Sequence, residues 1–121
     1  MAIHYSFQMQ SDHLLVKAWG MDEDLEEVKR YGEAVIQAAV EHNSPRILCD
    51  ETELVYRLEV AETFFSAEHI SKLVPSLHRV AIVTQASQLE TGKFWEDVAV
   101  NRGLYVRMYT SLEEARKWLL S

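Results

Sequence analysis

Residues 79–84 read RVAIVT, a short run of apolar and β-branched side chains that is typical of a buried strand. Two similar runs lie on either side of it in the chain, RILCD at residues 46–50 and LYVRMY at residues 104–109. Segments with helical spacing of apolar residues separate the three runs, at about 60–74 and 87–102. Strands that alternate with helices pair in parallel through right-handed crossovers, so these segments predict an α/β sheet.

The two ends of the chain complete this pattern. Apolar and polar side chains alternate over residues 3–10, and a second strand follows at 13–19, so we expect an antiparallel hairpin whose first strand has one covered face. A helical stripe then runs from Leu25 to about His42, and residues 111–119 form the last helix. The expected order is β-β-α-β-α-β-α-β-α, a single mixed five-stranded sheet flanked by helices in one domain over residues 1–121. Residues 51–57 show no regular period.

Cap residues mark the expected helix ends. Ser87 with Glu90, and Ser111 with Glu114, have the spacing of capping boxes. Gly103 suits the left-handed cap of the helix before it. The acidic residues 22–24 mark the start of the first helix, because the helix dipole favours negative charge there.

Composition bounds the function. The formal net charge is −7 and the pI is near 5.2, which disfavours general binding to nucleic acid or to anionic membranes. A single cysteine, Cys49, excludes an internal disulfide and fits a reducing compartment, so we expect a cytoplasmic protein. No apolar stretch is long enough to span a bilayer, and the start of the chain lacks the pattern of a signal peptide.

Polar residues that follow the expected parallel strands are candidates for a site, because ligands gather beyond the carboxyl ends of such strands. These candidates are Asp50, Thr52, Thr84 and Ser87. Each also has a structural interpretation: Ser87 caps a helix, and Asp50 hydrogen-bonds the backbone that follows it. Asp50 and Glu51 should point apart on an extended chain, which makes them a poor acid/base pair. The five histidines match no metal-ligand spacing, and we expect no cofactor.

Two aromatic pairs are the other candidates for binding. In Phe94-Trp95 one ring faces the core and its neighbour turns about 100° away; the exposed ring indicates a partner surface or an apolar pocket, unless both rings spread over the sheet. Phe64 and Phe65 could line the same pocket. In Tyr56-Arg57, the arginine could pair with Asp50 or Glu51, or bind an anion.

The chain resembles a known family over nearly its whole length. The RVAIVT strand, the helix that contains Phe94-Trp95 and ends in Asn101-Arg102-Gly103, and the closing YTSLEEARKWL of residues 109–119 are similar to the small SpoIIAA-like proteins. These are relatives of STAS domains, named for the sulfate transporter and anti-sigma factor antagonist. The resemblance implies a mixed sheet flanked by helices, and some relatives are also likened to lipid-binding Sec14-type domains.

One family feature is missing. Regulatory STAS domains carry an Asp-Ser-Ser-Gly-like phosphoacceptor after the third strand, whereas residues 50–57 read DETELVYR, with neither serine nor glycine. Thr52 has the only aliphatic hydroxyl there, and the acidic side chains of Glu51 and Glu53 would repel a phosphate on it. The phosphoserine switch is therefore not carried over.

These observations leave several functions open. The resemblance and the absence of a catalytic motif favour a non-enzymatic STAS-like regulatory or interaction module that binds a protein partner or a small apolar ligand. The alternatives are a Sec14-like carrier of a lipid or small molecule, and a small enzyme that uses Asp50, Thr84 and Ser87. The first strand could also form an open sheet edge, so a homodimer is expected.

Overall fold

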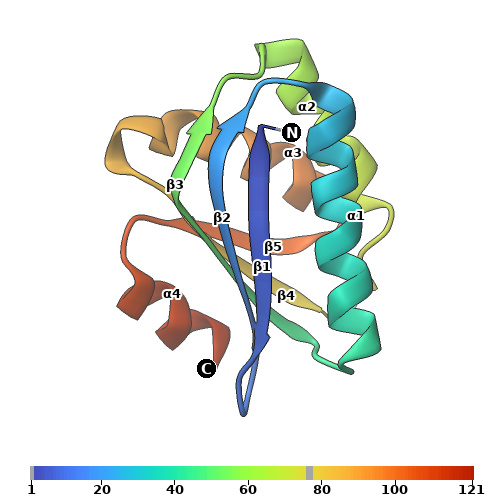
Figure 1. Cartoon of the computed structure of the whole chain (residues 1–121), viewed down its shortest axis with the longest axis vertical. Helices are drawn as coiled ribbons and strands as arrows, with labels where there is room; N and C mark the ends of the chain where they lie inside the picture. Colours follow the sequence, from blue (N-terminus) through green and yellow to red (C-terminus); the bar gives the residue numbers. More distant parts are fainter. Residues whose placement is uncertain (1, 76–77) are drawn as a thin grey trace.

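The computed structural model describes residues 2–75 and 78–121, in which one mixed sheet has helices on both faces (Figure 1). Its strands lie in the order β1-β2-β3-β4-β5; β1 is antiparallel to β2, and the other neighbours are parallel. The elements are β1 Ile3–Met9, β2 Leu14–Asp22, α1 Leu25–Glu41, β3 Arg46–Tyr56, α2 Val60–Ser71, β4 Arg79–Val83, η1 Ala86–Gln88, α3 Leu89–Asn101, β5 Tyr105–Tyr109 and α4 Leu112–Leu119. The α/β class, the five strands and their order along the chain are as the sequence predicts.

The sheet separates two cores of unequal size. Because side chains alternate along a strand, Ile47 and Cys49 of β3 face α1, α2 and α3, while Leu48 faces α4. The larger core lies on the side of the three helices, and the smaller one joins β3 and β4 to Ala115 and Leu119 of α4. Figure 1 shows α4 on the side of the sheet away from α1. No helix of residues 2–75 and 78–121 is both long and apolar enough to cross a bilayer.

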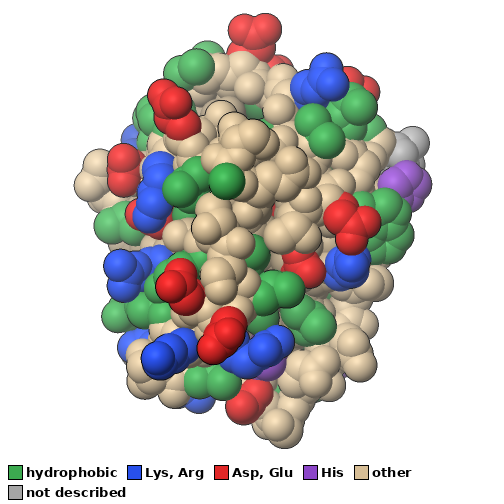
Figure 2. All heavy atoms as spheres, turned by 90° about the vertical axis from the view of Figure 1, so that its left-hand side faces the viewer, with side chains coloured by type: hydrophobic (Ala, Val, Ile, Leu, Met, Phe, Trp, Pro, Cys, Tyr) green, Lys and Arg blue, Asp and Glu red, His purple; other side chains and the backbone are tan. Residues whose placement is uncertain are grey.

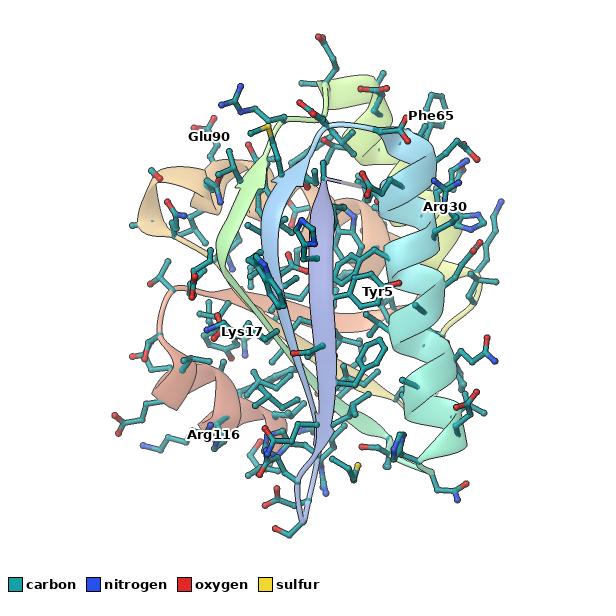
Figure 3. All side chains as sticks on the ribbon, viewed as in Figure 1. Tyr5, Lys17, Arg30, Phe65, Glu90 and Arg116 are labelled. Atoms are coloured by element: carbon teal, nitrogen blue, oxygen red, sulfur yellow. The ribbon has the colours of Figure 1, made fainter. Side chains whose placement is uncertain are left out.

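Strand β1 is less covered than its alternation suggests. Ile3 is 3% exposed, but Tyr5, Phe7 and Met9 on the same face remain 37–41% exposed. Tyr5 lies between β1 and α1, where its ring centroid is 5.3 Å from that of Tyr31 (Figure 3). The expected covered face is therefore only partly covered beyond Ile3, because packing against α1 leaves more than a third of each of these side chains exposed.

The helix ends agree with the sequence except at α3. Ser111 accepts a hydrogen bond from the Glu114 backbone N–H at 3.2 Å, and Gly103 has a φ of 95° at the end of α3. The expected capping box at Ser87 is wrong: a 3-10 turn precedes α3, and the cap residue is Gln88, which makes no side-chain cap bond. The side chain of Gln88 bonds instead to the sheet, as described below.

Candidate functional site

A cavity of about 110 Å³ lies between the sheet and helices α1, α2 and α3. Its walls are mainly apolar and come from strands as well as helices; they include Val28, Val35, Ile47, Ile70, Ile82 and Met108. Asp22, Glu51, Tyr31 and Tyr56 form one polar cluster in its lining, which also includes Thr63, Ser66 and Thr91. Among the described lining residues, Thr91 in the first turn of α3 is exposed, so the cavity approaches the surface near the carboxyl end of β4, which α3 follows.

The carboxylate of Glu51 is the centre of the polar end. It is 8% exposed, and its two oxygens accept one phenol each: Tyr31 donates to Oε2 at 2.8 Å and Tyr56 donates to Oε1 at 2.7 Å. Burial raises the pKa of Glu51, and the two tyrosine hydrogen bonds oppose that rise. Burial also holds the pKa values of Tyr31 and Tyr56 well above the ordinary value, so both phenols stay neutral and act as donors.

A β-bulge in β3 brings Glu51 and Tyr56 together. Side chains five residues apart in a regular strand point to opposite faces. Here Lys17 pairs with Asp50 and Trp19 pairs with Glu53, so β3 carries one extra residue at this point and its faces exchange. As a result Cys49 and Glu51 before the bulge, and Leu54 and Tyr56 after it, all line the cavity.

Asp50 stabilises this bulge. Its Oδ1 accepts from the backbone N–H of Thr52 at 3.1 Å and from the Thr52 hydroxyl at 2.7 Å. The expected bond from Asp50 to the backbone that follows is therefore present. The strand does not end at Asp50, as its apolar run suggests, but continues through the bulge to Tyr56. Asp50 and Thr52 support the cavity wall without lining it.

Two glutamine side chains replace the missing neighbour of β3 after β4 ends. Val83, the last residue of β4, pairs with Asp50, which leaves residues 51–56 without a strand on that side. Gln85 donates to the Thr52 carbonyl at 2.7 Å. Gln88 donates to the Leu54 carbonyl at 2.9 Å and accepts from the Tyr56 N–H at 2.9 Å. Both glutamines thus complete backbone bonds that would otherwise be unpaired.

Asp22, at the end of β2, is a second acid on the cavity. Its Oδ1 accepts from the Arg57 backbone N–H at 2.6 Å. Burial raises the pKa of Asp22 to about 7; the charge of Glu51 adds to the rise, and the backbone N–H groups of Arg57 and Leu58 oppose it. The cavity therefore has two carboxyl groups at one end.

The structure brings together only some of the predicted site residues. Tyr56 and Trp95 line the cavity, and the Trp95 indole donates to the Ser66 hydroxyl at 3.1 Å. Thr84 is buried close to Tyr56, and its hydroxyl lowers the pKa of that phenol. Phe94 is the ring that turns outward, with 37% of its surface exposed.

The remaining predicted residues lie elsewhere. Ser87 is exposed, and its hydroxyl contacts only Gln85, at 3.5 Å, among the described residues. The expected ion pair of Arg57 with Asp50 or Glu51 is wrong: among residues 2–75 and 78–121, its guanidinium pairs with neither. Arg57 is exposed because β3 has ended, while both acids are occupied by closer partners.

Phe64 and Phe65 do not line the cavity. Phe64 packs against the larger core with the Arg102 guanidinium 4.9 Å from its ring centroid, and Phe65 is 49% exposed. Of the four aromatic candidates for a pocket, Trp95 alone is in its wall. Within the described part of the chain, no group of three or more His, Cys, Asp or Glu side chains could hold a metal ion.

Sequence reasoning missed Tyr31, Glu51 as a central group, Asp22 and Gln88. Tyr31 does carry a signal: it lies three residues after Val28 and four before Val35, on the apolar stripe of α1. A tyrosine on a buried stripe needs a partner for its hydroxyl, which points to a buried acceptor nearby. No local pattern identifies Glu51 as that acceptor.

Comparison with known proteins places the fold. No protein-family model matches the sequence, and no curated protein matches it. Among solved structures, an anti-sigma factor antagonist from Mycobacterium paratuberculosis is similar with a TM-score of 0.71, 13% identity, and coverage of 98% of this chain and 95% of that one. An uncharacterized protein with a SpoIIAA-like fold from Shewanella loihica has a TM-score of 0.58 and 20% identity, over 98% and 94% of the two chains. The chain therefore has the SpoIIAA-like fold of STAS-related domains.

Proposed function

We propose that this protein is a non-enzymatic, SpoIIAA-like regulatory module that binds a small apolar ligand between its sheet and helices α1, α2 and α3. The mainly apolar cavity with the buried carboxylate of Glu51 in its wall carries this proposal. A ligand pocket of this type combines apolar walls with a few polar groups that fix orientation. The similarity to a protein described as an anti-sigma factor antagonist supports a regulatory role, in which the ligand would alter contacts with a protein partner.

The size of the cavity decides between the ligand classes. An engineered cavity of about 150 Å³ accommodates benzene, whereas pockets for drug-sized ligands measure roughly 300–1,000 Å³. At about 110 Å³ the cavity is smaller than the benzene-binding one and matches a molecule of about four or five non-hydrogen atoms. A Sec14-like lipid carrier would need a much larger space, so saturable binding of a fluorescent fatty acid would contradict the small-ligand version.

The contacts of the candidate catalytic residues support a non-enzymatic role. Asp50 is bonded to Thr52, and Ser87 is exposed on the turn before α3. Thr84 accepts from Gln88 at 3.2 Å and lies buried next to Tyr56. The three side chains thus do not converge on a common space.

Surface charge and the cysteine support two further parts of the proposal, namely that the protein does not bind nucleic acid and that it is cytoplasmic. On the face shown in Figure 2, Lys and Arg side chains are interspersed with Asp and Glu, without a continuous basic patch of the kind that nucleic acid requires. Cys49 is buried as a free thiol, and burial raises its pKa, which suits a protein of the reducing cytoplasm.

Thermal denaturation with 2-methylpropan-1-ol tests the ligand site. At ten times its dissociation constant the alcohol should stabilise the protein by about 1.4 kcal/mol, or roughly 3–6 °C. Cys49→Met, which fills part of the cavity, should remove this shift, and the matched variant Cys49→Ala should keep it. The same shift in Cys49→Met as in the unaltered protein, or none in the unaltered protein, would contradict the proposal.

A further inference from the structure

We infer that the cavity selects a protonated amine on a compact hydrocarbon body, in preference to an alcohol or a carboxylic acid of the same size. The inference rests on the proposed ligand-binding function and specifies its ligand. The geometry at Glu51 carries it, together with the charges of the cavity lining.

The carboxylate at the polar end of the cavity has hydrogen-bond acceptor positions that are not used. A carboxylate oxygen can accept two hydrogen bonds, and each oxygen of Glu51 accepts one, from Tyr31 or Tyr56. Each phenol has a single proton, which is already donated. One acceptor position therefore remains on each oxygen of Glu51, and an ammonium group, with three N–H donors, can fill both.

Two other donors in the walls, the Thr63 hydroxyl and the Trp95 indole, are already used, whereas the hydroxyls of Ser66 and Thr91 donate to no other described residue. The Thr63 hydroxyl donates to the Glu59 carbonyl at 3.0 Å, and the Trp95 indole donates to Ser66. A ligand that itself needs donors, such as a carboxylate, would find few in this cavity. A ligand that brings its own donors fits better.

Charge favours the same ligand. Among residues 2–75 and 78–121, the cavity lining contains two acids, Asp22 and Glu51, and no Lys, Arg or His side chain. A carboxylate buried among apolar groups without a cation is costly, and an ammonium ion would supply the missing charge in a charge-assisted hydrogen bond. The raised pKa values of both acids fit this absence of a neighbouring cation. A ligand carboxylate would instead add a third negative charge.

Three compounds that share one branched carbon skeleton test the preference: 2-methylpropan-1-amine, 2-methylpropan-1-ol and 2-methylpropanoate. We expect titration calorimetry at about pH 8 to show the amine binding at least tenfold more tightly than the alcohol, and no measurable binding of the carboxylate. Binding of the alcohol that equals or exceeds that of the amine would overturn this inference and leave the proposed function standing. Binding by none of the three would overturn both.

Variants locate the preference. Glu51→Gln keeps the shape of the side chain and removes its charge, so it should weaken amine binding at least tenfold and affect alcohol binding much less. Asp22 lies further than Glu51 from the two phenols, so Asp22→Asn should weaken amine binding less than Glu51→Gln does. It is the variant to test if the Glu51→Gln protein does not fold. An unchanged amine affinity in a folded Glu51→Gln protein would overturn the assignment. If only Asp22→Asn folds, an unchanged amine affinity in that variant would overturn it.

The response to pH gives an independent readout. The titratable groups around Glu51 are Tyr31 on α1, Asp22 at the end of β2, and Cys49, Asp50 and Tyr56 on β3. Asp22, whose pKa burial raises to about 7, gains charge between about pH 6 and about pH 8, while the phenols and the thiol stay protonated. Amine affinity should therefore rise over this range while alcohol affinity stays level; a parallel response of both ligands would contradict the inference.

Discussion

Glu51 shows how a single residue can determine the character of an apolar cavity. Burying a carboxylate costs several kcal/mol unless hydrogen bonds compensate it. Two neutral phenols provide part of that compensation, from α1 and from the far side of the bulge in β3. The group is thus held in place without a cation among the lining residues, which leaves it able to interact with a ligand.

Removal of either phenol hydroxyl should destabilise the folded protein, because the buried carboxylate then loses a hydrogen bond. Tyr31→Phe and Tyr56→Phe each leave one carboxylate oxygen without its donor, so each should lower the free energy of unfolding by about 1–3 kcal/mol at neutral pH. Urea denaturation measures this loss. Tyr5→Phe is the matched control, because Tyr5 is 40% exposed, and it should stay within about 0.5 kcal/mol of the unaltered protein. Equal effects in all three variants would contradict the role of Glu51.

The pKa of Asp22 predicts an unusual dependence of stability on pH. Its folded value of about 7 lies above the ordinary 3.8, so the folded state holds a proton that the unfolded state releases. The stabilising effect is complete below the unfolded pKa and is lost as the pH rises through the folded pKa. The free energy of unfolding should fall between about pH 4 and about pH 7, by up to 1.4 kcal/mol per pH unit for this group, with Glu51 acting in the same direction.

Asp22→Asn separates this contribution from that of other groups. The amide does not titrate, so the variant should lose the Asp22 part of the slope and be more stable than the unaltered protein at about pH 8. Urea denaturation across the pH range checks both points. A slope identical to that of the unaltered protein would show that Asp22 titrates normally in the folded state.

At the scale of elements, glutamine side chains rather than a neighbouring strand hydrogen-bond the backbone of the second half of β3 on one side. Gln88→Ala removes the bonds to Leu54 and Tyr56 and leaves buried backbone groups unpaired, which should cost about 1–3 kcal/mol. Hydrogen exchange at the Tyr56 N–H should speed up correspondingly. Gln8→Ala, an exposed position on β1, is the control and should change neither quantity. An unchanged exchange rate at Tyr56 in Gln88→Ala would contradict this role.

The same element shows where prediction from sequence succeeds and where it ends. The apolar run at residues 46–50 identifies the first half of β3, because its side chains are buried against helices on both faces. The second half carries polar residues and reverses its faces at the bulge, so no constant period describes it. Ser87 likewise fits a capping box locally, but the bonds of Gln88 to β3 set the start of α3. These features depend on contacts between distant segments.

The whole molecule exposes an edge strand with little protection. β1 carries no Asp, Glu, Lys, Arg or Pro, and Tyr5, Phe7 and Met9 lie partly exposed along it. Natural edges are usually blunted by charge or proline, so we expect self-association of two copies through β1. Light scattering over a range of concentrations should show a dimer that Phe7→Lys weakens. Val60→Lys adds the same charge at a side chain 73% exposed on α2 and should leave the dimer intact. A monomer at every concentration would contradict this expectation.

The cavity is a property of the whole fold and cannot be predicted from the sequence of any single segment. Tyr31 and Glu51 lie 20 residues apart in the chain, and Trp95 bonds to a serine 29 residues before it. Periodicity predicts which face of each element is buried, and that suffices for the order of elements and the two layers of helices. It does not show whether the buried faces fill the space between them, which depends on the shapes of side chains from at least six elements.

An NMR titration with 2-methylpropan-1-ol tests the central claim, that this space between β3 and the three helices is a ligand site. We expect chemical-shift changes that saturate and that concentrate on the Trp95 indole N–H and the backbone amides of Glu51, Tyr56 and Gly92, all of which belong to lining residues. Changes confined to the exposed side chains of β1, or changes that grow linearly without saturation, would contradict the claim.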